Sequence, residues 1–350
     1  MTAAAELTEL TDTVRAVLTK HGGRDSLRGT LGTAPGFDEK LWRILCDQVG
    51  VAALAIPEEY GGIGAGLAPM FAVVEELGRT LHTPPLLGSA LLATQALLWT
   101  GNTEACERLL PEVAEGSRVL ALAWAGEQGW DTPGVVAADG VLNGTASYVL
   151  DGDVAGTLLV VTEDGLYEVD AAATGVTRRD RETMDPSRRL SEFTFDGVAA
   201  TRLGDVPQQR LRELAWVALA FEQVGAADHC LWMTVEYTKT REQFGRPIGG
   251  FQALQHRMAD MYVQVESARS MALAAAAALE NGSPDTALEV ASARRYCTQA
   301  LQAVTAETVQ MHGGIAITWE HDAHLYFKRA HGDAQLFGKP TSLPRPVASA

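Results

Sequence analysis

Two segments in the C-terminal half of the chain combine residue types that suit an anionic or flat ligand. The first is Arg-Glu-Gln-Phe-Gly at 241–245, and the second is Gln-Met-His-Gly-Gly at 310–314. A guanidinium beside a glycine turn can bind a pyrophosphate through two parallel hydrogen bonds. Two consecutive glycines at a helix end let the backbone approach a ligand closely. Both segments are therefore candidate binding elements.

Each segment also has a simpler interpretation, and the pattern alone leaves both open. Arg241 can be a solvated arginine at a helix end, or a partner of the neighbouring Glu242. Gly313 and Gly314 can end a helix, because glycine adopts the left-handed conformation that helix C-termini often need.

Two other kinds of chemistry find less support in the sequence. His321 and His324 are spaced to share one helical face, which could hold a metal ion, but no matching third ligand cluster is visible. A polar helix start, with acidic residues near the helix N-terminus, explains the same stretch, and we expect no metal. A Gly-x-Ser-x-Gly motif is absent, so a hydrolase triad is not indicated.

Composition excludes several classes of protein. The 350 residues carry a net charge of −16 with 47% hydrophobic residues, which is typical of a folded protein. Such a charge disfavours nucleic acid and anionic membrane surfaces as partners. No stretch approaches the ~20 apolar residues of a membrane span, and the first residues do not resemble a signal peptide. The four cysteines form no Cys-x-x-Cys pair, so we expect a cytoplasmic protein without disulfides or zinc.

The elements that must position the two segments fall into three parts, which predict an α+β fold. Apolar spacings of three and four predict helices in the first part, including one that ends at Gly22 and one that ends at Gly50. Apolar runs separated by Asp-Gly predict hairpins of an antiparallel β-domain. Long apolar-striped helices then predict a four-helix bundle. The predicted domains are 1–117, 118–206 and 207–350. The Asp-Gly pairs are 139–140, 151–152, 164–165 and 196–197.

Helix boundaries in the bundle follow from local signals. We expect helices over 211–240 and 251–279. Ser283 as N-cap and Pro284 at the first helical position predict a third helix that runs to His312. The last helix is expected over about 320–337.

The chain resembles the acyl-CoA dehydrogenase family over nearly its whole length. The matching pieces occur in order, in a matching domain organisation. They are Pro-Glu-Glu-Tyr-Gly-Gly (57–62), Leu-Asn-Gly-Thr (142–145), Asp-Pro-Ser-Arg (185–188), Arg-Glu-Gln-Phe-Gly (241–245) with Phe251-Gln252, Gln-Met-His-Gly-Gly (310–314) and Thr-Trp-Glu (318–320).

The resemblance implies a flavin enzyme with a helical domain, a β-domain and a four-helix bundle, assembled as dimers or dimers of dimers. In this family a carboxylate removes the α-proton of an acyl thioester, and the β-hydride goes to FAD. The electrons then pass to an electron-transferring flavoprotein. FAD lies across a subunit interface: one subunit holds the flavin ring, and the bundle of its neighbour holds the pyrophosphate and adenosine. The residues implied for that second half are Arg241, Phe244, Gln310, Gly313 and Gly314.

The half that holds the flavin ring departs from the family pattern. A Thr-Glu-Pro stretch followed by Gly-Ser-Asp is replaced by the sequence 123–131, in which only Glu127 and Asp131 match. The strand that usually carries Trp-Ile-Thr-Asn reads Tyr-Val-Leu-Asp at 148–151. These replacements remove hydroxyl and backbone partners of the ring's polar edge.

The usual catalytic base is also missing. The family's Tyr-Glu-Gly triplet reads Leu-Phe-Gly at 336–338, so Phe337 stands at the base position. A second family position for the base falls on Ala215, with Glu213 and Glu222 nearby but out of register. Trp216 stands where many members keep an arginine for acyl-CoA. We therefore expect no catalytic residue of the usual kind, with Glu222 and Glu213 as fallback candidates.

These features favour one subunit of a heteromer, of the kind that actinobacterial relatives use in lipid and sterol catabolism as a heterotetramer. Such a subunit supplies the cross-interface half of the FAD site to a second acyl-CoA dehydrogenase subunit. An alternative is an active homo-oligomer, a dimer or tetramer that acts on an acyl-CoA or an acyl-carrier-protein thioester with Glu222, Glu213 or Glu127 as base. A second alternative is a non-enzymatic scaffold.

Overall fold

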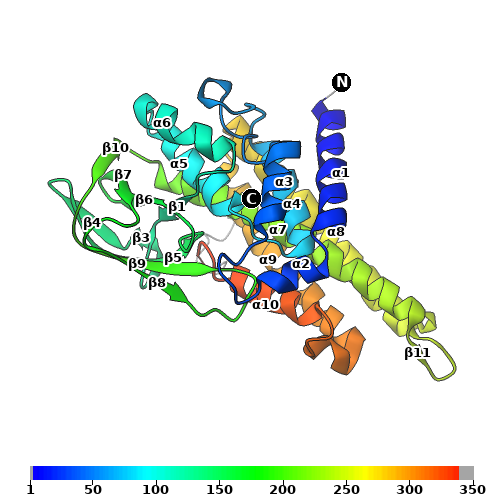
Figure 1. Ribbon diagram of the computed structural model, residues 1–350. Helices are drawn as coiled ribbons and strands as arrows, with labels where there is room; N and C mark the ends of the chain where they lie inside the picture. Colours follow the sequence, from blue (N-terminus) through cyan, green and yellow to red (C-terminus); the bar gives the residue numbers. More distant parts are fainter. Residues whose placement is uncertain (1–2, 339–350) are drawn as a thin grey trace, which may run out of the picture. The chain divides into compact units, whose positions relative to one another are not determined.

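The computed structural model describes residues 3–338, which form two compact units. The first unit contains residues 3–73 and 82–215, and the second contains residues 74–81 and 216–338. Figure 1 shows the helices and strands of both units along the chain. The two units are described separately below.

The helices of the first unit come mainly from its N-terminal part. α3 begins after Asp38, whose carboxylate accepts a hydrogen bond from the Leu41 N–H, and it ends at Gly50 with φ 74°. This end is the one that the sequence predicts. The helices are α1 (Ala3–His21), α2 (Arg24–Thr30), α3 (Glu39–Val49), η1 (Glu58–Tyr60), the first turns of α4 (Leu67–Thr80), the π-helical η2 (Leu86–Ala93), α5 (Thr94–Trp99) and α6 (Thr103–Ala114).

The strands of the first unit form two four-stranded sheets and one two-stranded ribbon. The sheet orders are β1-β6-β7-β10, β4-β5-β9-β8 and β2-β3. Apolar residues of both larger sheets, such as Leu142, Phe193, Leu158 and Val160, meet in one buried core. The strands are β1 (Leu120–Ala123), β2 (Ala125–Gly126), β3 (Gly129–Pro133), β4 (Val135–Ala138), β5 (Val141–Leu150), β6 (Thr157–Thr162), β7 (Gly165–Asp170), β8 (Val176–Arg181), β9 (Leu190–Ala199) and β10 (Thr201–Gly204).

Two of the four predicted hairpin turns are confirmed and two are wrong. The pairs at 139–140 and 164–165 join antiparallel neighbours β4–β5 and β6–β7. The pair at 151–152 instead carries the chain from β5 to β6 in the other sheet, and the pair at 196–197 lies inside β9. Asp-Gly supplies the positive φ that a crossover or an irregular strand also needs, as Asp151 (φ 57°) shows. One pair of strands, β1–β6, is parallel, which the prediction of an antiparallel domain did not include.

The second unit is helical. Two predicted boundaries are wrong: α9 begins at Thr286, after Asp285 rather than after Ser283, and the last helix is confined to α10. The elements are residues 74–81 of α4, α7 (Gln208–Thr240) from residue 216, β11 (Glu242–Gln243), β12 (Arg246–Pro247), η3 (Ile248–Gly250), α8 (Gln252–Asn281), α9 (Thr286–His312), η4 (Gly313–Ile317) and α10 (Ala323–Asp333).

Two glycines let the backbones of α4 and α7 touch within the second unit. A Cβ on Gly78 would lie 2.2 Å from the Glu222 carbonyl oxygen, and one on Gly225 would lie 1.9 Å from the Glu75 carbonyl oxygen. No other residue type fits at such distances. Arg79 of α4 forms an ion pair with Asp228 of α7, which joins the two helices where their backbones touch. Within α4, Arg79 Nε also lies 3.0 Å from Glu76 Oε1.

A buried ion pair joins α7 to α10. Arg329 Nη1 lies 2.6 Å from Glu222 Oε1, and both side chains are buried. The Tyr326 hydroxyl, one turn earlier on α10, donates to the Arg79 carbonyl oxygen. A charged pair in the interior is stable only while both partners are present, because a lone buried charge is costly to desolvate.

Glu222→Gln is therefore expected to lower the free energy of unfolding by about 3–5 kcal/mol, because Arg329 loses its buried counter-charge. Urea unfolding followed by circular dichroism measures the change. Glu236→Gln, which breaks an exposed pair with Lys239, is the matched control and should change stability by less than ~1 kcal/mol. Equal effects of the two substitutions would contradict the assignment.

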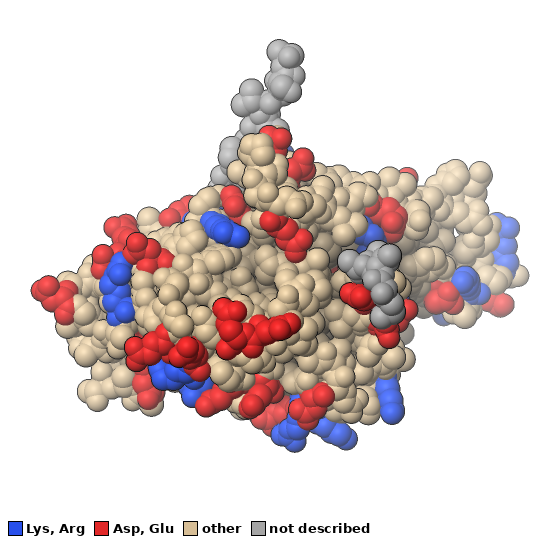
Figure 2. Space-filling model, turned by 90° about the horizontal axis from the view of Figure 1, so that it is seen from above, with Lys and Arg blue, Asp and Glu red and all other residues tan. Residues whose placement is uncertain are grey.

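The visible surface carries more acidic than basic side chains, as the net charge of −16 implies (Figure 2). Figure 2 shows acidic side chains spread over the visible face, with fewer basic ones between them. Within residues 3–338, no helix is long and apolar enough to cross a membrane. The four cysteines are free and buried.

Candidate functional site

The structure brings the two candidate segments to one end of the second unit. α7 ends at Thr240, immediately before segment 241–245, and α9 ends at His312, within segment 310–314. The two helices are in contact near these ends: Thr234 Oγ1 lies 3.1 Å from Thr308 Oγ1, and the rings of Tyr237 and His312 stack with centroids 4.2 Å apart. Residues about seventy positions apart in sequence thus share one surface.

The first segment forms a short hairpin that presents its side chains outward. β11 pairs with β12, and the turn places Phe244 (φ 54°) and Gly245 (φ 77°) in left-handed conformations. Phe244 is 92% exposed, and its ring lies nearly perpendicular to that of Phe251, with centroids 6.1 Å apart. Arg241 is exposed, and its guanidinium has no hydrogen bond or ion pair with any residue in 3–338. The pairing with Glu242 is not formed, so this cation is available to a ligand.

The second segment combines a helix end with open space. Gly313 (φ 66°) is the C-cap of α9 and donates its N–H to the Val309 carbonyl oxygen. No described atom lies within 4 Å of a Cβ built on Gly313 or on Gly314, and Gln310 is exposed. The helix-end interpretation is therefore correct for Gly313, and it does not exclude binding, because the backbone beyond it stays accessible.

A stack of rings supports both segments, and the sequence argument did not find it. His312 is buried between Tyr237 and His321, whose ring centroid lies 4.5 Å from its own. Its Nδ1 lies 2.8 Å from the Thr308 carbonyl oxygen, and the Tyr237 hydroxyl donates to the His312 carbonyl oxygen. Burial, together with the neighbouring His321, lowers the pKa of His312. The only signal was the position of these residues, directly before Gly313 and four residues before Arg241.

The histidines at 321 and 324 do not form a metal site in the described part of the chain. His321 Nδ1 accepts a hydrogen bond from the Ala323 N–H at 3.2 Å. His324 meets the ring of Trp319 edge-on, with centroids 4.8 Å apart. No group of three or more His, Cys, Asp or Glu side chains within 3–338 is arranged to hold a metal ion.

The segment where the family resemblance places the flavin ring is filled with aromatic side chains. In the first unit, Trp130 meets Trp124 edge-on at 5.6 Å and stacks on Tyr148 at 6.1 Å between ring centroids. Trp124 and Trp130 are buried, and the next inward position of β5, Leu150, is buried and aliphatic. We call Trp124, Trp130 and Tyr148 the aromatic cluster.

Arg212 packs against the aromatic cluster. Its guanidinium lies 2.9 Å from Asp131 Oδ1, donates to the Trp130 carbonyl oxygen at 2.5 Å and lies 5.8 Å from the Trp124 ring centroid. Asp131 is thus engaged inside its own unit, and Glu127 is exposed in the β2–β3 turn. This region offers indole rings, aliphatic groups and the one hydroxyl of the partly exposed Tyr148, and the buried Trp124 Nε1 has no hydrogen-bond partner within residues 3–338. The donor set fits the polar edge of a flavin ring poorly, whereas the exposed guanidinium and glycines of the second unit fit a pyrophosphate well.

Phe337, which the family resemblance predicts at the position of the base, has a phenyl ring that cannot accept a proton. Phe337 is buried in a left-handed conformation (φ 59°), and its carbonyl oxygen accepts a hydrogen bond from Trp216 Nε1 at 2.7 Å. Arg294, which has no exposed surface, donates to the carbonyl oxygens of Asp333, Leu336 and Gly338. Burial lowers the pKa of Arg294 to about 10, which still leaves it charged at neutral pH. The segment around Phe337 is therefore fixed by specific donors.

Both fallback carboxylates are engaged in contacts of their own. Glu222 is buried with its Oε1 on Arg329. Glu213 is partly exposed in the first unit, and its Oε1 accepts a hydrogen bond from Gln209 at 2.9 Å. Ala215 is fully buried there. A substrate would have to displace Arg329 to reach Glu222, so the structure adds no support for it, and the role of either glutamate stays a prediction.

Trp216→Phe is expected to lower the free energy of unfolding by about 1–3 kcal/mol, because the buried Phe337 carbonyl oxygen loses its indole donor. Trp232→Phe makes the same change at a half-exposed position of the same helix and should change stability little. Thermal and urea unfolding of the two variants make the comparison. A loss that is the same for both would show that the Trp216 hydrogen bond contributes nothing particular.

Comparison with known proteins agrees with this architecture. Residues 4–117 match the family model of the acyl-CoA dehydrogenase N-terminal domain, and residues 210–339 match that of the C-terminal domain. The acyl-CoA dehydrogenase IpdE2 of Mycolicibacterium smegmatis is 44% identical over 95% of this chain and 94% of its own length.

Two solved structures share the fold over almost the whole chain. The steroid acyl-CoA dehydrogenase Tcur3481–Tcur3483 (a G363A variant) superimposes with a TM-score of 0.90, 33% identity, and coverage of 97% of this chain and 96% of that one. The ChsE4–ChsE5 complex of Mycobacterium tuberculosis also gives 0.90, with 30% identity and coverage of 98% and 95%. The chain belongs to the acyl-CoA dehydrogenase family, whose members are oxidoreductases that act on CH–CH bonds of acyl-CoA thioesters.

Proposed function

We propose that this chain is the subunit of a heteromeric, FAD-dependent acyl-CoA dehydrogenase that supplies the pyrophosphate and adenosine half of the FAD site to a partner subunit. The observation that carries the proposal is the contrast between the two halves of the chain. Arg241, Gln310 and the two glycines are exposed and unobstructed, whereas the segments that the resemblance assigns to the ring half pack Trp124 and Trp130 against each other and Tyr148. A homomer would need both halves in each chain.

The chemistry of the chain's own residues supports the same division. Arg241 would hold the pyrophosphate through charge-assisted hydrogen bonds, and Phe244 offers a free aromatic face to the adenosine end. The accessible backbone at 313–314 would approach the phosphates closely. FAD, when bound, supplies the hydride acceptor for α,β-desaturation. Proton abstraction falls to the partner subunit, because Phe337 cannot perform it.

Relatives support the remaining parts of the proposal. One solved neighbour is described as a steroid acyl-CoA dehydrogenase with two named components, and another as a complex of two proteins. We infer an acyl-CoA thioester of a lipid or sterol degradation product as the substrate, a heterotetramer as the assembly, and an electron-transferring flavoprotein as the electron acceptor.

The chain purified alone is expected to be colourless, and the chain co-purified with its partner subunit is expected to carry FAD. Absorbance near 450 nm, measured against protein concentration, decides this. About one FAD per chain in the isolated protein, with turnover, would replace the proposal with the homomeric enzyme. A partner complex that assembles without binding FAD would favour the scaffold.

Arg241→Ala is expected to weaken FAD binding by the complex roughly 10- to 100-fold, because charge-assisted hydrogen bonds to the pyrophosphate contribute about 1.5–3 kcal/mol. Flavin fluorescence during titration of the apo-complex measures the dissociation constant. Arg257→Ala, which removes an exposed arginine of α8 that pairs with Glu307, is the control and should leave the constant unchanged. An unchanged constant in Arg241→Ala would remove this residue from the site.

Phe337→Glu in the isolated chain is expected to remain inactive, although it restores a carboxylate at the family's base position. The segments assigned to the ring half still carry the aromatic cluster, and Arg294 and Trp216 hold the backbone of the segment in place. Desaturation of an acyl-CoA with an artificial electron acceptor provides the assay. Turnover above that of the unmodified chain would contradict the division of labour.

A further inference from the structure

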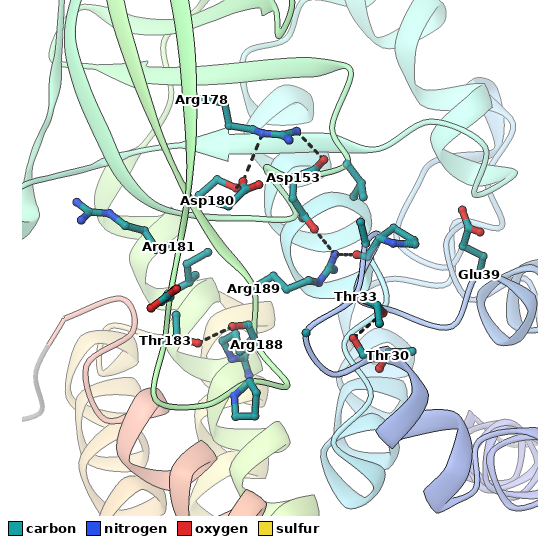
Figure 3. A pocket seen from close by; sticks show the side chains of 18 residues that line it. Thr30, Thr33, Glu39, Asp153, Arg178, Asp180, Arg181, Thr183, Arg188 and Arg189 are labelled. Carbon is teal, nitrogen blue, oxygen red and sulfur yellow. Dashed lines mark hydrogen bonds and ion pairs between the residues drawn. The ribbon is translucent and has the colours of Figure 1, made fainter.

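A cavity of about 830 Å³ lies within the first unit, and its lining contains none of the residues proposed to hold FAD. One wall is the loop 31–38 between α2 and α3, which we call the strap. The opposite wall consists of the turn after β5, strand β8 and the loop before β9 (Figure 3). Its lining is rich in charged side chains, among them Asp153, Arg178 and Arg189.

One guanidinium ties the strap to the opposite wall. Arg189 Nη1 donates to the Pro35 carbonyl oxygen of the strap and lies 2.6 Å from Asp153 Oδ2, a link visible in Figure 3. The guanidinium carbon of Arg189 also lies 5.2 Å from the centre of the Phe37 ring. The strap is shaped around this side chain: Gly36 has φ 73°, and a Cβ there would lie 2.1 Å from Arg189 Cδ.

A second carboxyl shares the same guanidinium. Asp151 Oδ1 lies 3.6 Å from Arg189 Nη2, and its side chain is buried. On its other side Asp151 lies against the backbone of η2, where a Cβ on Gly88 would come within 2.3 Å of Asp151 Oδ2. Besides Arg189, the charged groups that face it are Asp153 and Arg188, and the Ser89 backbone also donates to it.

Burial dominates the titration of this carboxyl. It raises the pKa of Asp151 to about 7, with Asp153 adding to the rise and Arg189 and Arg188 opposing it. Burial raises the pKa of Asp153 as well. An exposed aspartate has a pKa near 3.9. Asp151 therefore binds its proton more tightly while the strap is closed than it would once opening lets water reach it. Ionisation therefore favours opening over the range between these two values, and the effect levels off above about pH 7.

We propose that the strap is a proton-dependent gate of this cavity, closed while Asp151 is protonated and open more often as Asp151 ionises. The gate rests on the cluster of Arg189, Asp151 and Asp153 and on the strap that Arg189 holds.

Hydrogen exchange of the strap amides, followed by mass spectrometry and corrected for intrinsic exchange, tests the gate in the full-length chain. The opening equilibrium should rise at least tenfold between pH 5.5 and pH 7.5 and should change little above pH 8. Asp151→Asn should abolish the rise. Asn has nearly the same shape and tolerates the positive φ of this position, so the variant preserves the backbone.

Asp139→Asn is the matched control, because Asp139 also has a positive φ (51°) but is exposed in the β4–β5 turn. It should retain the full pH dependence of the unmodified chain. A strap whose opening is independent of pH in the unmodified chain would overturn the proposal, and so would an Asp151→Asn variant with unchanged dependence.

Cysteine labelling gives a second readout that does not depend on strap amides. The native cysteines are buried, and burial raises the pKa of Cys46 to about 12 and of Cys106 to about 11, so they react slowly. Val154→Cys places one thiol on the cavity wall. The rate at which this thiol reacts with iodoacetamide is measured in Val154→Cys and in the double variant that also carries Asp151→Asn, at the same pH. Thiol ionisation affects both rates equally, so it cancels in their ratio. The ratio should rise at least tenfold from pH 5.5 to pH 7.5, and a constant ratio would contradict the gate.

Discussion

Two buried guanidiniums need hydrogen-bond and ion-pair partners, and this need constrains the positions of the helices in the second unit. Arg294 and Arg329 have no exposed surface, and a buried cation destabilises the fold unless most of its donors are met. Within residues 3–338, both terminal nitrogens of Arg294 have partners and its Nε has none. Arg329 finds Glu222 of α7, and Arg294 finds three backbone carbonyl oxygens between Asp333 and Gly338. α7, α9, α10 and the segment after α10 must therefore keep fixed positions relative to one another.

The same constraint fixes the backbone around Phe337, where the family resemblance predicts the base. Phe337 lies within the stretch that Arg294 fixes, and Trp216 adds a further hydrogen bond to its backbone. The position is thus a tightly packed part of the core, stabilised by the same contacts that stabilise the helices. In the first unit, Arg212 in the same way joins Asp131 to the backbone of Trp130 in the aromatic cluster.

The sequence predicted most of the architecture, because helices and strands follow from local periodicity. The end of α3 at Gly50 and the span of β5 agree with it. Asp-Gly pairs predicted turns less well, since the same positive φ serves a hairpin, a crossover or an irregular strand. The start of α9 was misplaced because Ser283 and Asp285 are both acceptable caps by composition.

The candidate site was predictable only in part. The segments 241–245 and 310–314 were found from residue types and family resemblance, and their roles stay predictions. Their exposure, and the stack of Tyr237 on His312, depend on contacts between residues far apart in sequence. The same is true of Trp216 and Phe337, which are 121 positions apart. The Arg189 cluster combines the strap with the β-region, and no local pattern indicates it.

The aromatic cluster changes which substitutions this chain can accumulate over evolutionary time. Positions that contact a bound ring are constrained one by one, because the shape of the ring does not vary. Trp124, Trp130 and Tyr148 instead contact one another, so a smaller side chain at one position creates a void that a larger one at another can fill. Descendants of this chain are expected to alter these three positions together, and such correlated replacement would mark a lineage in which packing, rather than a ligand, selects the residues.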